Sequence, residues 1–314
     1  MLSDDQFVAS GEGQCDPRGI SAPGRKASEM RGRNWALALA AGTLSLLVAA
    51  TAAAQTTDHT YTWIDVGLPF GINNLGQIVG ISESHGYHGF LLNTDGSVIT
   101  IDFPGALSTV SYGINNAGQI VGGFQDSTGA HGYLYSGGSF TTIDVPGATT
   151  GTTVAWGIND ASQIVGSFSD GTGSHGFLYS GGSFTAIDVP GAGATGAYGI
   201  NDVGQIVGTF LNNGWHGFLY SGGSFLQIDA PDAFLTVAQG INTIGQIVGW
   251  FYDGGDRYTD FLYSGGTFIT IFGEQANSIN DAGQIVNGDG FLATPVGGST
   301  AKQSQQKLIM KKNR

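Results

Sequence analysis

The sequence predicts an all-β protein, a six-bladed β-propeller built from four-stranded repeats of about 42 residues. The main observation is a decapeptide, GIN-x-x-GQIVG with one Gly replaced by Ser in one copy, which occurs five times. A sixth copy has the altered form SINDAGQIVN, and the intervals are 42, 44, 42, 41 and 38 residues. In addition, Gly supplies 54 of 314 residues and charged residues only 11%. This composition favours turn-rich β structure over a charged disordered chain.

The amino-terminal region predicts export. Residues 1–29 are polar and patternless, and we expect a mis-assigned or disordered leader there, with Met30 as the true initiator. An unusually long start of the signal sequence is the alternative. Residues 30–54 have the charged start, the apolar run and the alanine-rich end of a secretory signal peptide. The apolar run Trp35–Ala50 is short for a membrane-spanning helix, so we expect cleavage near Ala54 and no membrane span afterwards.

The predicted mature chain begins near Gln55 with a linker over residues 55–60. The single cysteine, Cys15, precedes the cleavage point, so no disulfide is expected. The sequence therefore predicts a secreted protein that is extracellular or attached to the cell surface, with a bacterial periplasm as the other compartment that export could reach.

The repeats begin near residues 71, 113, 157, 199, 240 and 278 and define a predicted propeller over residues 61–296. In the second repeat, apolar runs over 109–115, 119–124, 131–137 and 139–145 are bounded by turn residues. Each repeat is thus expected to form a four-stranded meander. Several runs are apolar on both faces, as strands are when neighbouring sheets cover both sides.

The two ends of the repeat array complement each other. The last repeat supplies three apolar runs, the third at 290–294, but lacks a fourth before the tail. The missing run stands at the other end, because YTWIDV at 61–66 matches FTTIDV at 140–145. We therefore expect the first strand of the mature chain to complete the last blade and close the ring, which removes the exposed edges of an open array.

Residues that recur in every repeat are expected to serve the scaffold. We expect the Asn to shape the hairpin turn and the Gln amide to satisfy backbone groups between blades. The positions are Asn73, Asn115, Asn159, Asn201, Asn242, Asn280, Gln77, Gln119, Gln163, Gln205, Gln246 and Gln284.

Histidines and aspartates recur less strictly. Four repeats carry a histidine before the third strand, and the other two have Thr259 and Asp289 there. A structural hydrogen bond is the expected role, because residues on separate blades lie beyond the reach of one metal ion. The carboxylates Asp65, Asp102, Asp144, Asp188 and Asp229 recur after the fourth strand, with Phe272 at the sixth position. No cofactor or metal site is predicted, although Asp126, Asp170 and Asp253 in loops leave calcium open.

The fifth repeat departs most from the others and holds the candidate ligand site. Its loop WFYDGGDRYTD at 250–260 combines aromatic rings with acids and an arginine, which could stack on sugar rings or anchor a peptide. The alternative for its tryptophan is a core position between blades. The candidate ligand-binding residues are Trp215, Trp250, Tyr252, Asp253, Asp256 and Arg257.

The charge distribution argues against nucleic acid and anionic membranes as partners. Between Arg33 and Lys302 the only Lys or Arg is Arg257, whereas polyphosphate binding needs several cations. Lysines and an arginine return only in residues 297–314, a tail expected to be disordered and basic.

The units GIN-x-x-GQIVG followed by HGF or HGY resemble the HAF-family extracellular repeats of bacteria, named after a His-Ala-Phe motif. The resemblance covers residues 61–294. Gly stands here in place of the family's Ala, after His88, His131, His175 and His216, and the fifth repeat has TDF from Thr259. The resemblance implies a secreted repeat protein and brings no catalytic residue with it.

The sequence favours a noncatalytic module that binds an extracellular carbohydrate or protein ligand. No nucleophile elbow, zinc-protease motif or P-loop occurs, and no catalytic residue is assigned. The alternatives are a carbohydrate-active propeller enzyme, a hydrolase or lyase with acids such as Glu83, Asp253 or Glu274, and a structural envelope or matrix protein. An enzyme would require acids from different blades to converge in one cleft.

Overall fold

The computed structural model describes residues 59–82, 86–255, 258–271 and 275–295, which form strands, turns and bends without a helix. Within these ranges, then, no segment is a helix long and apolar enough to span a membrane. The predictions made for the leader, the signal peptide, the linker up to residue 58 and the tail from residue 297 lie outside the described residues.

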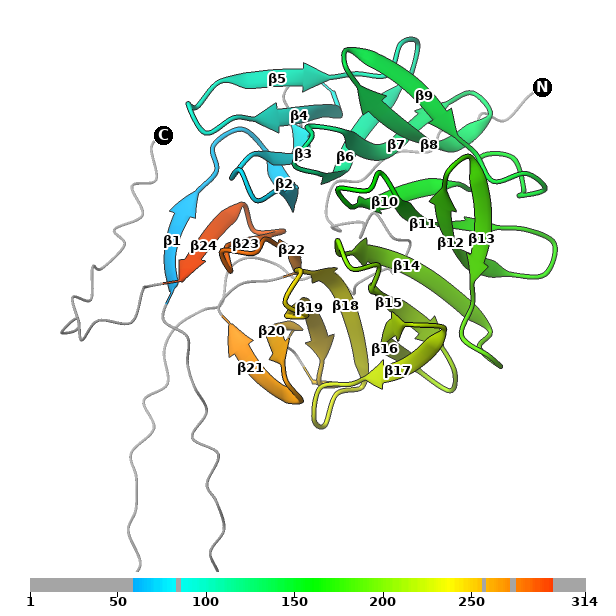
Figure 1. Cartoon of the computed structure of the whole chain (residues 1–314), viewed down its shortest axis with the longest axis vertical. Helices are drawn as coiled ribbons and strands as arrows, with labels where there is room; N and C mark the ends of the chain where they lie inside the picture. The colour runs from blue at the N-terminus through cyan, green and yellow to red at the C-terminus, as the bar shows by residue number, and fades with distance from the viewer. Residues whose placement is uncertain (1–58, 83–85, 256–257, 272–274, 296–314) are drawn as a thin grey trace, which may run out of the picture. The chain divides into compact units, whose positions relative to one another are not determined.

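Antiparallel meanders of four strands account for the described residues, and Figure 1 shows their sheets in a propeller-like ring in chain order. The first sheet contains β2 (Leu68–Ile72), β3 (Ile78–Ser82), β4 (His88–Leu92) and β5 (Val98–Ile101). The second contains β6 (Ser108–Ile114), β7 (Ile120–Asp126), β8 (Gly129–Ser136) and β9 (Ser139–Ile143). The fifth repeat supplies β18 (Leu235–Ile241), β19 (Ile247–Tyr252), β20 (Tyr258–Ser264) and β21 (Thr267–Ile271).

The third and fourth repeats share one eight-stranded sheet. The third supplies β10 (Val154–Ile158), β11 (Ile164–Ser169), β12 (Ser174–Ser180) and β13 (Ser183–Ile187). The fourth supplies β14 (Ala194–Ile200), β15 (Ile206–Leu211), β16 (Trp215–Ser221) and β17 (Ser224–Ile228).

Six separate sheets were expected, and this part of the prediction is wrong, because the described residues form four four-stranded sheets and one of eight strands. A single parallel pair, Ser174 with Ala194, joins the two meanders. Gly173, just before this pair, has a φ of +152°, a backbone conformation that residues with a side chain rarely adopt.

The last sheet is built from both ends of the described chain. Its order is β1 (His59–Trp63), β24 (Phe291–Pro295), β23 (Ile285–Asn287) and β22 (Ala276–Ile279). The pairing predicted between the first strand and the last repeat is confirmed, with five residue pairs from His59↔Pro295 to Trp63↔Phe291. β1 begins two residues before the predicted run, and Ile64 continues the pairing through its N–H, which donates to the Gly290 carbonyl at 2.9 Å.

The core consists of apolar clusters, each shared by neighbouring repeats. One cluster joins Val79 and Ile101 of the first sheet to Ile120 and Tyr133 of the second. Another joins Val286 of the last sheet to Ile72 of the first, together with Ile64. Packing of this kind covers both faces of a strand, which explains the absence of an alternating polar pattern.

Candidate functional site

The repeated asparagines connect the sheets around the centre of the ring. Each Asn Oδ1 accepts the backbone N–H of the Gln four residues later at 2.9–3.0 Å, which fixes the turn. Each Asn Nδ2 donates to the backbone carbonyl of the Asn in the next repeat at 3.0–3.2 Å. The last of these bonds runs from Asn280 to Asn73, so the six bonds form a continuous cycle.

The role expected for Gln between blades belongs to Asn instead. Each Gln Oε1 accepts the Asn Nδ2 of its own repeat at 2.7–2.8 Å, so the Gln orients the Asn amide. The reason is geometric: the Asn lies at the inner strand end beside the next repeat, and all six asparagines are buried, with at most 4% of each residue exposed.

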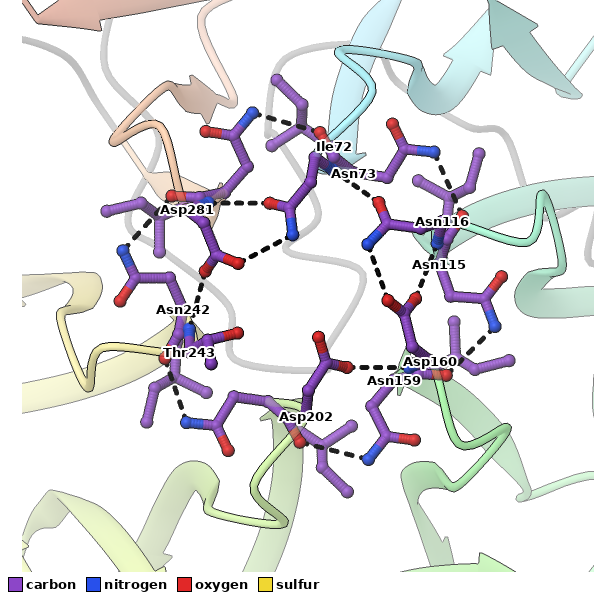
Figure 2. A pocket seen from close by; sticks show the side chains of 18 residues that line it. Ile72, Asn73, Asn115, Asn116, Asn159, Asp160, Asp202, Asn242, Thr243 and Asp281 are labelled. Carbon is purple, nitrogen blue, oxygen red and sulfur yellow. Dashed lines mark hydrogen bonds between the residues drawn. The ribbon is translucent and has the colours of Figure 1, made fainter.

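A second tier of side chains lies above the asparagines at the mouth of a central pocket. Each repeat contributes the residue after its Asn, and in five repeats that residue's side chain accepts a backbone N–H of the preceding repeat at 2.8 Å. Figure 2 shows the side chains of Asn116, Asp160, Asp202 and Asp281 directed toward the centre. The full tier is Asn74, Asn116, Asp160, Asp202, Thr243 and Asp281.

Three carboxylates from different repeats therefore converge on this pocket, which the sequence analysis did not foresee. Asp160 accepts the Asn116 side-chain amide at 2.7 Å, and Asp281 accepts that of Asn74 at 2.8 Å. The pocket is small, with a volume of about 70 Å³. Nowhere in the described part of the chain does a group of three or more His, Cys, Asp or Glu side chains have the arrangement of a metal site.

The four histidines bind the recurring aspartates, so the predicted structural hydrogen bond is confirmed. Nδ1 of His88, His131, His175 and His216 lies 2.8–3.0 Å from a carboxylate oxygen on the neighbouring strand end. The partners are Asp102, Asp144, Asp188 and Asp229. The fifth repeat has Thr259 and Phe272 at the two positions, so it lacks both members of the pair.

Two of the loop aspartates considered for calcium are engaged within their own loops. The hydroxyl and the N–H of Thr172 both donate to Asp170 Oδ1, at 2.7 and 2.6 Å, and Thr128 bonds Asp126 in the same way. These bonds favour the ionised form, so they lower the pKa of Asp126 and lower the pKa of Asp170 to about 2.

We expect the carboxyl of Asp170 to titrate near pH 2 in an NMR titration, and the Thr172→Val variant to move this pKa up toward 3.8. The folded-state pKa lies below the unfolded one, so the stabilisation from this group is present above pH 3.8 and is lost as the pH falls toward 2. The pKa of Asp126, which Thr128 lowers in the same way in the preceding repeat, serves as control and should not respond to the change. A midpoint of 3.8 for Asp170 in the unchanged protein would contradict the assignment.

The fifth repeat places three aromatic rings together at the strand ends away from the central pocket. Phe234, just before β18, is 71% exposed, and its ring lies edge-on to that of Tyr252 at 6.2 Å between centroids. Tyr252 stacks in turn on Tyr258, at 5.1 Å. We call Phe234, Tyr252 and Tyr258 the aromatic cluster. Phe234 was missed in the sequence because it belongs to the connection before the strand.

The loop beside the aromatic cluster is held by short hydrogen bonds. The N–H of Phe234 donates to the Tyr252 carbonyl at 2.7 Å, and the Tyr252 hydroxyl donates to the Gly255 carbonyl at 2.6 Å. Asp253 Oδ1 accepts the N–H of Gly255 at 2.9 Å. The first bond holds the backbone at Phe234 beside the end of β19, the hydroxyl bond holds the ring of Tyr252, and Phe234 stays exposed.

Of the other predicted ligand residues, Trp250 meets the aromatic cluster from the core side, with its ring edge-on to that of Tyr258 at 5.5 Å between centroids. Trp250 is only 2% exposed, so it offers no free ring face, and its placement fits the core alternative. Trp215 is half-buried on β16, and the described residues show no ring contact between it and the cluster. Asp256 and Arg257 lie outside the described residues.

Comparison with solved structures supports the propeller-like fold. A candidate gluconolactonase matches with a TM-score of 0.50 and 10% identity over 76% of this chain and 92% of its own. A gluconolactonase from Xanthomonas campestris matches with a TM-score of 0.50 and 12% identity, over 78% and 92%. The likeness is one of fold alone. The Dos1 propeller is a more distant match, with a TM-score of 0.39 and 12% identity over 71% and 65%. No family model matches the chain, and no curated protein sequence does.

Proposed function

We propose that this chain is a secreted, noncatalytic binding protein that holds an extracellular carbohydrate, or else a protein ligand, on the aromatic cluster. The observation that carries the proposal is the exposed ring of Phe234, which lies edge-on to Tyr252, which in turn stacks on Tyr258. Rigid aromatic faces provide large contact areas with little loss of conformational entropy, and they suit the apolar faces of sugar rings.

The scaffold of this proposal is a closed six-bladed propeller of HAF-type repeats, in which the eight-stranded sheet counts as two blades. Its support is the pairing of β1 with β24 and the hydrogen bond from Asn280 back to Asn73. Export through the signal peptide at residues 30–54 would place the protein outside the cell or in the periplasm. On this scaffold the fifth repeat differs from the others, and differences between repeats are where ligand specificity is expected.

A propeller enzyme is the second candidate, favoured by the convergence of Asp160, Asp202 and Asp281 on the central pocket. Two observations weigh against it. Each carboxylate already accepts a backbone N–H of a neighbouring repeat. The volume of about 70 Å³ is also well below the roughly 300–1,000 Å³ of most small-molecule sites, which leaves little room for a sugar ring. The gluconolactonase likeness, at 10–12% identity, gives no support for that activity.

A glycan array probed with the mature protein tests the binding function. We expect binding to a defined set of glycans, weakened at least about tenfold by Phe234→Ala or Tyr252→Ala, because each loses most of a stacking surface. Leu107→Ala is the matched control: Leu107 is 76% exposed before β6, the position that Phe234 occupies before β18. Binding that is equally sensitive to Leu107→Ala, or indifferent to both ring changes, would refute the site. Binding to peptides alone would favour a protein ligand.

A further inference from the structure

An exposed apolar collar surrounds the mouth of the central pocket. The second variable residue of each GIN-x-x-G turn is aliphatic in all six repeats, although every copy is exposed. Leu75, Val203 and Ile244 are 61%, 65% and 73% exposed. Such turn positions are usually polar, and grouped exposed apolar residues are typical of interaction surfaces. The collar comprises Leu75, Ala117, Ala161, Val203, Ile244 and Ala282.

The collar encloses a negative charge that nothing in the described residues neutralises. The mouth carboxylates Asp160, Asp202 and Asp281 accept hydrogen bonds from backbone N–H groups and amides, which carry no charge. The described residues contain no Lys or Arg, and Arg257, the one such residue between Arg33 and Lys302 in the sequence, lies outside them. A partner for this face should therefore combine cations with aliphatic side chains.

The end of the chain has this composition. In residues 302–314, the apolar triplet Leu308-Ile309-Met310 is preceded by Lys307 and followed by Lys311 and Lys312. Lysines have long apolar stems that can lie on the collar while their ammonium groups reach the carboxylates. A second copy of the ring is a poor partner, because two acidic mouths facing each other would repel.

The described chain also ends on the same face as the mouth. A Cβ added to Gly283, in the turn next to Asp281, would lie 3.0 Å from Cγ of Pro295, the last described residue. β24 is two strands from the inner strand β22, a separation of about 10 Å. Lys307 is twelve residues beyond Pro295, and twelve extended residues span up to about 40 Å, so the segment can reach the whole collar.

From these observations we infer that residues 302–314 bind across the central mouth of their own chain, with the apolar triplet on the collar and the lysines on the carboxylates. This contact lies on the face opposite the aromatic cluster and does not depend on the proposed function. It would leave the ligand face free while covering the one acidic concavity at the centre.

Zero-length cross-linking of the full mature chain with a carbodiimide tests the inference, using an equal mixture of ¹⁴N- and ¹⁵N-labelled protein. After pepsin digestion we expect amide links from Lys307, Lys311 or Lys312 to Asp160, Asp202 or Asp281, within one isotope label. Their yield should fall at least about fivefold in 1 M salt, where the Debye length is about 3 Å. The aromatic-cluster variants should leave the yield unchanged, which separates the two proposals.

A collar variant supplies the matched test. Val203→Ser and Ile244→Ser change exposed side chains, so the fold should be retained, and the same links should fall at least about threefold. As a second measurement, replacing the triplet 308–310 with Ser should speed hydrogen exchange of the Asp202 and Thr243 amides. Links of mixed label, links spread equally over Asp144 and Asp188, or exchange rates unaffected by the triplet would each overturn the inference.

Discussion

Deletion of residues 56–67 is expected to abolish cooperative folding or to lower the Tm by roughly 10–20 °C. The deletion removes β1, which makes five residue pairs with β24, and it removes Ile64 from the cluster that joins the last sheet to the first. Loss of each buried apolar side chain lowers the free energy of unfolding by about 2 kcal/mol. The backbone of β24 would also be left unpaired at the edge of its sheet, and such edges promote aggregation. Thermal unfolding followed by circular dichroism, with light scattering for aggregates, measures both effects.

A rearranged chain provides the control for this deletion. Residues 59–66 can be placed after Pro295 through a Gly-Gly turn, as Gly137 and Gly138 join β8 to β9. This order restores the strand at the place it holds in the other repeats, so the Tm should return to within a few degrees of the unchanged protein. An unchanged Tm in the deleted chain, or failure of the rearranged chain to recover it, would contradict the assignment of β1 to the last sheet.

Gly122→Ala is expected to destabilise the protein by about 3 kcal/mol or more, lowering the Tm by roughly 10 °C. A Cβ on Gly122 would lie 1.9 Å from the backbone oxygen of Val110 and 2.7 Å from the ring of Tyr133. The neighbouring strand cannot move away, because it is itself packed against the next sheet. Differential scanning calorimetry of the purified variant gives the Tm and the enthalpy.

Gly171→Ala is the matched control for the glycine prediction. A Cβ at this loop position meets nothing within 4 Å, and no positive φ is required there. The Tm should therefore stay within about 2 °C of the unchanged protein. Equal effects of the two substitutions would show that the glycine after Gln-Ile-Val is retained for a reason other than close packing.

Much of the fold could be predicted because the same repeat occurs six times in the sequence. The meander strands follow from runs bounded by turn residues, and the partner of β1 follows from the strand missing at the end of the last repeat. The parallel pair Ser174↔Ala194 could not be predicted, since it depends on how closely two glycine-containing loops approach. Repetition identifies a repeat but does not show where two repeats touch.

The candidate sites were less accessible from sequence. Trp250 and Tyr252 stand two residues apart in one strand, yet the first is 2% exposed and the second belongs to the aromatic cluster. The sequence does contain a pattern that marks the mouth of the central pocket. The residue after each repeated Asn is Asn, Asp or Thr, and the next residue is aliphatic. This pattern does not by itself predict a pocket, because the turns come from distant repeats and only the arrangement of the sheets brings them together.

The asparagine cycle has a direction, and this makes every junction between repeats the same kind of contact. Each repeat offers a carbonyl to the repeat before it and an amide to the repeat after it, as subunits do in a head-to-tail cyclic oligomer. A fragment cut between any two repeats would keep one unsatisfied donor and one unsatisfied acceptor at its ends. Such fragments should recognise each other in register, so complementary pieces of this chain are suited to reassembly from separate polypeptides.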